Sequence, residues 1–250
     1  HMNIIKRMTL IAAAAICFAA VSCNKDNTIQ YNNTTMGNVV DGAYVSDQGN
    51  IFHIAEQTCA GKIDTMKRAL TVCDVLNKTE GGKDNEYDVR MNLILQVLVK
   101  DIVPAGAEVE EDVKVEHPVN IDQLWISGGY INMYVTFPFN EANKAKHMIN
   151  LVQQESKEAG TYEFRLTHNA FEDALTPDSD IWQYKLSGGY VSFPINSFMK
   201  EDEAALKISW KGFNTNNFVN TQEKSIQGRH KKDGFEQAPI LTTAARVAIN

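Results

Sequence analysis

The densest group of side chains that could do chemistry lies between residues 168 and 180. A histidine begins it, and an amide and carboxylates follow at short intervals: His168, Asn169, Glu172, Asp173, Asp178 and Asp180. Carboxylate oxygens gathered in a loop can bind calcium, and a histidine beside them can act as a general base. However, Asn, Asp and Pro177 are ordinary turn residues, and His168 continues the buried-face alternation of Tyr162 and Leu166. We therefore predict a structural loop here rather than a catalytic or metal site.

Motifs of known enzymes are missing from the rest of the sequence. No GxSxG, HExxH, CxxC, GxGxxG or P-loop pattern occurs, and the six histidines are scattered. We predict that the chain is not an enzyme and that it requires no cofactor or metal ion.

Aromatic side chains form a second candidate site. Trp125 opens a strand-like run, and Tyr130, Tyr134 and Tyr190 lie on the face opposite the predicted core. Rings exposed on a sheet could stack on sugars or take part in a protein interface, where Tyr and Trp are enriched. Packing between sheets is the alternative, and it is the more common role of such residues. These four residues are therefore a candidate binding face with a structural alternative.

The amino terminus has the proportions of a secretory signal. His1-Met2 is typical of a cloning scar, Lys6-Arg7 is basic, and fourteen largely apolar residues run from Met8 to Val21. This run is too short to span a bilayer but fits a signal peptide. We expect residues 1–22 to be absent from the mature protein.

The end of this apolar run resembles the lipobox of bacterial lipoproteins. Small or apolar residues, Ala20-Val21-Ser22, precede Cys23, and polar residues follow it. The resemblance implies cleavage before Cys23, a diacylglyceryl thioether on its sulfur and acylation of its new amine. More than one acyl chain anchors a protein stably. We expect a lipid anchor in the outer membrane, and the sequence leaves open whether the protein faces the periplasm or the cell surface.

Two further cysteines, Cys59 and Cys73, lie fourteen residues apart. An exported protein meets an oxidising compartment, so a disulfide between them is one expectation, and closing such a loop contributes about 3 kcal/mol in the chain-entropy model. Alternatively, a buried cysteine behaves as a small apolar residue. The sequence does not decide between a disulfide and two free thiols.

The charge of the chain excludes one class of partner. The formal net charge is −7, and loss of Lys6 and Arg7 with the signal lowers it to −9. Nucleic-acid binding needs a basic face for phosphate contacts. We therefore expect no nucleic-acid partner.

Hydrophobic patterning divides the rest of the chain into a tether, two domains and a tail. Residues 23–38 are polar and predict a flexible tether. Residues 39–103 hold short alternating runs, the last of which, 87–103, is too long for one straight strand, and this predicts a small closed barrel. Residues 104–213 alternate more cleanly and predict an antiparallel β-sandwich. Residues 214–250 lose the alternation and predict a poorly ordered tail.

A short motif occurs twice in the second domain. Ser127-Gly128-Gly129-Tyr130 recurs as Ser187-Gly188-Gly189-Tyr190, and each copy leads into Phe-Pro-x-Asn. The two copies could be equivalent strands, or two strands could have acquired similar turns independently.

The order of these runs resembles the NigD-like lipoproteins of Bacteroidota. The residues that carry the resemblance are Tyr44 to Gly49, Arg68 to Val75, Tyr87 to Val89, Val99 to Ile102, Trp125 to Asn132, His147 to Leu151 and Leu166 to Asn169. The resemblance covers about Val39 to Phe213 and implies an all-β protein, with an N-terminal OB-type barrel followed by a C-terminal β-sandwich. One family member, encoded in a bacteriocin gene cluster, is regarded as an immunity protein. The implied function is protein recognition at the cell envelope, and glycan binding by the aromatic face is the alternative.

Overall fold

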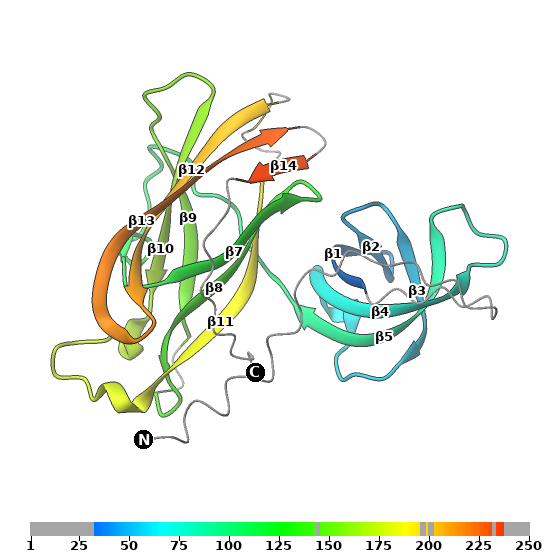
Figure 1. The fold of residues 1–250 in the computed structure, drawn as a ribbon, viewed down its shortest axis with the longest axis horizontal. Coiled ribbons are helices and arrows are strands. Elements are labelled where there is room, and N and C mark those ends of the chain that lie inside the picture. Colours follow the sequence, from blue (N-terminus) through cyan, green and yellow to red (C-terminus); the bar gives the residue numbers. More distant parts are fainter. Residues whose placement is uncertain (1–32, 144–145, 196–198, 200–202, 232–233, 238–250) are drawn as a thin grey trace. The chain divides into compact units, whose positions relative to one another are not determined.

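The structure is a computed structural model that describes residues 33–143, 146–195, 199, 203–231 and 234–237. The chain divides into two compact units, residues 1–99 and 100–250, and strands dominate both (Figure 1). The predicted all-β fold class is confirmed. The signal, Cys23 and most of the tether lie outside the described residues. Within the described residues, none of the helices has the length and apolar character needed to cross a membrane.

The first unit is a closed barrel with the strand order β1-β2-β3-β5-β4. Its strands are β1 (Asn33–Val40), β2 (Ala43–Ser46), β3 (Ile51–Gln57), β4 (Arg68–Lys78) and β5 (Glu86–Gln96). Neighbouring strands pair antiparallel except β3 and β5, which are parallel. The long run 87–103 splits after Gln96, as its length required, and β6 (Leu98–Val99) follows.

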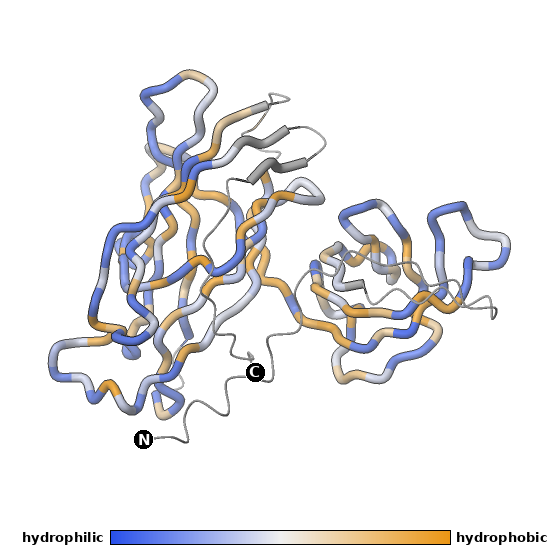
Figure 2. The backbone as a smooth tube through the Cα atoms, viewed as in Figure 1, coloured by the Kyte–Doolittle hydropathy of each residue, from blue (hydrophilic) through white to orange (hydrophobic). Residues whose placement is uncertain are grey.

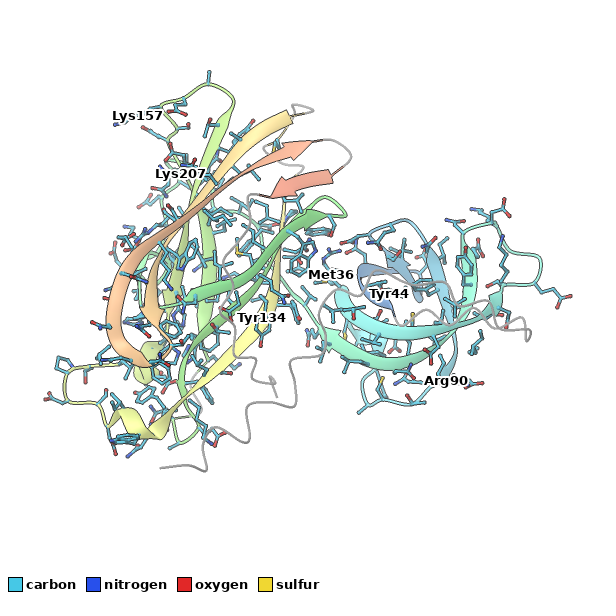
Figure 3. All side chains as sticks on the ribbon, in the orientation of Figure 1. Met36, Tyr44, Arg90, Tyr134, Lys157 and Lys207 are labelled. Carbon is cyan, nitrogen blue, oxygen red and sulfur yellow. The ribbon has the colours of Figure 1, made fainter. Side chains whose placement is uncertain are left out.

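The barrel interior is filled by apolar and aromatic side chains that alternate along the strands. Its fully or almost fully buried members include Tyr44, Phe52, Cys73, Val89 and Met91, and Figure 3 shows Tyr44 among the barrel strands. A two-residue turn joins β1 and β2, with φ of 50° at Asp41 and 81° at Gly42. Positive φ at both turn residues matches the right-handed twist of a hairpin.

The barrel begins earlier than the sequence predicted. Residues 33–38 were expected to belong to the tether, but they form the first part of β1, which pairs with β4 from Asn33↔Cys73 to Asn38↔Arg68. Met36 is buried there, and the Tyr44 hydroxyl donates a hydrogen bond to the carbonyl of Thr35 at 2.8 Å. Polar composition hid this strand because backbone pairing, rather than apolar side chains, holds most of it.

The second unit is a sandwich of two sheets, with orders β14-β13-β12-β10-β9 and β11-β8-β7. Its strands are β7 (Asn120–Ser127), β8 (Tyr130–Asn140), β9 (Met148–Gln154), β10 (Thr161–Asn169), β11 (Tyr184–Pro194), β12 (Glu203–Asn214), β13 (Asn217–Lys231) and β14 (Gly234–Gln237). The predicted sandwich is confirmed, although β10 and β12 are parallel rather than antiparallel. The unit begins at Lys100, four residues before the predicted boundary. The acidic stretch 108–112 follows this boundary, and its last two residues begin the short helix α1 (Glu111–Lys114).

The core of the sandwich agrees with the alternation seen in the sequence of residues 104–213. Its buried residues come from alternate positions of both sheets, among them Ile131, Met133, Val135, Phe164, Leu166, Leu206, Ile208 and Trp210. Apolar stretches lie on the strands and hydrophilic residues dominate the loops (Figure 2).

The structure corrects one prediction about the second unit and shows how the repeated motif is used. The segment after residue 213 was expected to be poorly ordered, but β13 pairs with β12 from Asn214↔Asn217 to Glu203↔Lys231. Few of its side chains are buried, so it lacks the alternation that reveals a strand. The repeated Ser-Gly-Gly-Tyr motif has two different structures: Gly128 and Gly129 form the β7–β8 turn with positive φ, whereas Gly188 lies within β11 opposite Thr136.

Candidate functional site

A chain of three buried polar side chains lies at one end of the sandwich. His147, which precedes β9, places its Nδ1 2.8 Å from Nε2 of His168 on β10. The other nitrogen of His147, Nε2, lies 2.9 Å from Oδ2 of Asp173, which ends the short helix η3 (Phe171–Asp173). The side chains of His147 and Asp173 are 4% and 0% exposed, and His168 is 1% exposed. We call these three residues the buried anchor.

Backbone pairing positions His168. The segment before β7 runs beside the end of β10, where the backbone N–H of His168 donates to Val115 and its carbonyl accepts from His117. The ring completes this arrangement, since Nδ1 lies 2.9 Å from the carbonyl oxygen of Pro118. Three contacts to one segment therefore fix both the position and the orientation of this ring.

Asp173 collects hydrogen bonds from three directions. Besides His147, it accepts from the backbone N–H of Asn140, the last residue of β8, and from Nδ2 of Asn143 at 2.8 Å. Phe137 packs on the face of His147, with ring centroids 4.3 Å apart and planes inclined by 20°. The anchor therefore joins β8, β9, β10 and η3 in one place.

Burial dominates the electrostatics of the anchor. Burial, followed by the proximity of His147, lowers the pKa of His168 to about 3. Burial also lowers the pKa of His147, against the hydrogen bond and charge of Asp173, which raise it. The three side chains are almost fully withdrawn from water, and their contacts hold β8, β10 and η3 together.

The anchor holds the loop that runs from Ala170 to Gln183, which we call the Trp182 loop. Its start is fixed by Asp173 and by the backbone N–H of Ala170, which donates to Nδ1 of His117 at 2.9 Å. Its end is fixed by Gln183, whose Oε1 accepts from Asn140 Nδ2 at 3.3 Å. One residue, Asn140, thus contacts both ends of the loop.

Between these fixed ends the loop presents an exposed tryptophan in acidic surroundings. Trp182 is 87% exposed and Ile181 beside it is 41% exposed. Both lie in the short helix η4 (Ile181–Gln183), where Asp180 caps the backbone N–H of Trp182. Glu172, Asp178 and Asp180 are exposed, and residues 171–183 contain no Lys or Arg. The loop extends away from the sheets at the end of β10 (Figure 1).

The structure brings together only part of the group predicted from sequence. His168 and Asp173 meet, but through His147, which lies twenty-one residues before His168 and was read as a scattered histidine. In the sequence, His147 stood out only because the segment from His147 to Leu151 resembles the NigD-like lipoproteins. Glu172, Asp178 and Asp180 remain on the exposed loop, and among the described residues no group of three His, Cys, Asp or Glu is placed to hold a metal ion.

Three of the four candidate aromatic residues pack on one another. Tyr190 on β11 lies opposite Tyr134 on β8 with ring centroids 4.7 Å apart, and Trp125 on β7 approaches Tyr190 edge-on at 6.3 Å. Tyr134, labelled in Figure 3, is only 6% exposed. Tyr130 lies at the start of β8, beside the β7–β8 turn. This arrangement favours the packing alternative over a sugar-binding face.

Of the two alternatives that the sequence left open for Cys59 and Cys73, the structure has the free thiols. Cys59 and Cys73 are free thiols, the first half-buried and the second fully buried in the barrel core. The Cys59 thiol instead approaches the carbonyl oxygen of Met91 at 3.7 Å. Burial raises the pKa of Cys73 to about 12, and the charge of Asp74 adds to the effect. Cys73 therefore behaves as a small core residue, the second alternative that the sequence left open.

Fold and site together define a two-unit, all-β protein with a closed barrel, a β-sandwich and a loop held by buried polar residues. The family model described as the NigD-like C-terminal beta sandwich domain matches residues 101–224, and this part of the chain belongs to that domain family. No curated protein matches it in sequence.

Solved structures share the fold at low sequence identity. A "putative TOXIN related protein" from Parabacteroides distasonis is 21% identical, with a TM-score of 0.53 and coverage of 80% of this chain and 93% of that one. A NigD-like immunity protein from Bacteroides caccae is 15% identical, with a TM-score of 0.51 and coverage of 76% and 88%. A "putative lipoprotein" from Bacteroides fragilis is 12% identical, with a TM-score of 0.52 and coverage of 81% and 98%.

Proposed function

We propose that this protein is a lipid-anchored cell-envelope protein that recognises a protein partner through the Trp182 loop, and that the recognition protects the cell against a bacteriocin. The observation that carries the proposal is Trp182, 87% exposed on a loop fixed at both ends. Tryptophan is enriched among the residues that dominate binding energy at protein interfaces. A fixed loop also loses little conformational freedom on binding, which favours affinity.

The charge of the loop indicates the chemistry of the partner. Three exposed carboxylates, Glu172, Asp178 and Asp180, lie in the same loop as the indole, and residues 171–183 contain no Lys or Arg. Complementary charge accelerates association and selects partners. The partner is therefore a basic protein surface with an apolar pocket for the indole. The net charge of −7 supports the same preference and argues against a nucleic-acid partner.

Membrane attachment is supported by the sequence around Cys23 and by a fold shared with a protein described as a lipoprotein. The outer membrane is the proposed location, and no catalytic activity is proposed.

Protection of cells tests the proposal directly. Deletion of the gene sensitises the cell to a bacteriocin made by its neighbours, and the wild-type gene restores resistance. A Trp182→Ala gene, expressed at the same level, restores little resistance. The matched control is Val219→Ala, which removes an exposed apolar side chain (49% exposed) from β13 and restores resistance fully. Full protection by Trp182→Ala would show that the loop is not the binding surface, and unchanged killing after deletion would exclude immunity.

A further inference from the structure

The facing nitrogens of His147 and His168 need a proton between them. We infer that the folded protein keeps one proton on this pair at neutral pH, with His147 as a buried cation between the Asp173 carboxylate and a neutral His168. The inference concerns the anchor alone, and it stands whether or not the Trp182 loop binds a partner.

The two rings meet edge to edge rather than face to face. Their centroids are 5.0 Å apart, their planes are inclined by 21°, and the two nitrogens are 2.8 Å apart. The difference of 2.2 Å equals about two centroid-to-nitrogen distances of an imidazole ring, so both nitrogens lie between the rings on nearly one line. The lone-pair directions of the two rings therefore point at each other.

The outer nitrogens of the pair fix where the other protons are. A carbonyl oxygen only accepts, so Nδ1 of His168 must carry the hydrogen that reaches Pro118. Asp173 already accepts from Asn140 and Asn143, as a carboxylate does, so Nε2 of His147 must carry the hydrogen that reaches it.

Two neutral rings would then have bare nitrogens facing each other at 2.8 Å. A neutral imidazole has one N–H, and in each ring the outer nitrogen has used it. Two lone pairs at this distance repel, and both are buried away from water that could separate them. One added proton turns the contact into an N–H···N hydrogen bond and satisfies every ring nitrogen of the pair.

The surroundings place that proton on His147, because its hydrogen bond to His168 and the adjacent Asp173 carboxylate offset the burial that otherwise lowers the pKa of His147. Its ring lies between the Asp173 carboxylate at 2.9 Å and the face of Phe137, and an aromatic face attracts a cation. His168 contacts no carboxylate in its own ring plane among the described contacts, and burial lowers its pKa to about 3. His168 is therefore the neutral acceptor, and a second proton on the pair is excluded.

The other charged and titratable groups around the pair leave this assignment in place. They are Lys146 next to His147, Glu116 and His117 before β7, Glu172 in η3, Arg165 on β10 and Lys211 on β12. Glu116 is occupied by Arg165, and burial followed by Lys211 lowers the pKa of His117. From β8, the uncharged residues Phe137, Phe139 and Asn140 contact the anchor, and Phe137 packs on both histidine rings. Asp173 is thus the anion in direct contact with the pair.

Nitrogen chemical shifts of the histidine rings test the inference on the full chain. In protein labelled with ¹⁵N-histidine at pH 7.5, both nitrogens of His147 should show attached protons, whereas His168 should show a proton on Nδ1 only. A His147→Gln variant assigns the signals. A single protonated nitrogen on His147 at this pH would overturn the inference, and so would protons on both nitrogens of His168.

The pH dependence of unfolding of the second unit gives an independent measurement. Unfolded histidines titrate near 6.5, so above this pH the folded pair binds one proton more than the unfolded chain. The unfolding equilibrium constant should therefore rise by about tenfold for each pH unit above 7, relative to a His147→Gln variant that lacks the pair. If the variant does not fold, the ring-nitrogen signals of the wild-type protein still decide. Equal pH dependence in the two proteins would show that the pair is neutral.

Discussion

Replacement of Asp173 by alanine is the most direct test of the buried anchor. The change removes an acceptor from the backbone N–H of Asn140 and from Nε2 of His147, both of which stay buried, and from the more exposed Asn143. Each buried donor left without a partner costs about 1–3 kcal/mol, and breaking a buried charged pair costs about 3–5 kcal/mol. Because these costs overlap at one carboxylate, we expect a loss of about 3–5 kcal/mol in the free energy of unfolding of the second unit.

Tryptophan fluorescence during urea unfolding measures this loss selectively. The three tryptophans, at positions 125, 182 and 210, all belong to the second unit, so the barrel does not contribute to the signal. The neighbouring exposed residue provides the control, since Glu172→Ala should change stability by less than about 0.5 kcal/mol. A loss below about 1 kcal/mol for Asp173→Ala would refute the view that this carboxylate holds the anchor together.

Four further outcomes follow from the structure. Tyr44→Phe should cost the barrel about 1–2 kcal/mol, because the hydroxyl is shared between the backbone carbonyls of Thr35 and the buried Ala69; hydrogen exchange of the barrel strands measures it. At pH 8, iodoacetamide should alkylate Cys59 but not Cys73, whose pKa burial raises to about 12, and peptide mass mapping reads the result. Gly188→Ala should cost about 1–3 kcal/mol, because an added Cβ would lie 2.4 Å from a backbone oxygen of β8; fluorescence-monitored unfolding again applies. Cys23→Ser should release the protein from membranes, and recovery of this variant in the detergent phase would contradict lipid anchoring.

The alternation of apolar and polar residues was the strongest predictor of the fold in this sequence. The alternation in residues 104–213 predicted a sandwich, and Ile131, Met133 and Val135, which alternate in this segment, are all buried. Alternation identified these strands because each central strand of the sandwich has one face on the apolar core. It missed β13 because this strand buries few side chains and is held mainly by backbone hydrogen bonds to β12, which leave no trace in residue type.

The candidate site was less predictable because its members meet only after folding. His168 and Asp173 are close in sequence, but the residue that connects them, His147, comes from the start of another strand. The residues next to a histidine in a polar segment do not indicate which distant side chain it will contact. The antiparallel pairing of β9 with β10, which sets Met148 opposite Asn169, is what brings the two histidines together.

The same geometry explains why a tryptophan is left exposed. A loop of this length can be fixed either by burying its large apolar side chain or by polar contacts at its ends. Here the contacts of Asp173 and Gln183 with Asn140 fix both ends, so Trp182 is not needed for packing and remains 87% exposed. Removing its side chain should therefore leave the stability of the sandwich within about 0.5 kcal/mol of the wild type. A larger loss in Trp182→Ala would mean that the indole packs on the protein itself, and the loop would then have no free anchor to offer a partner.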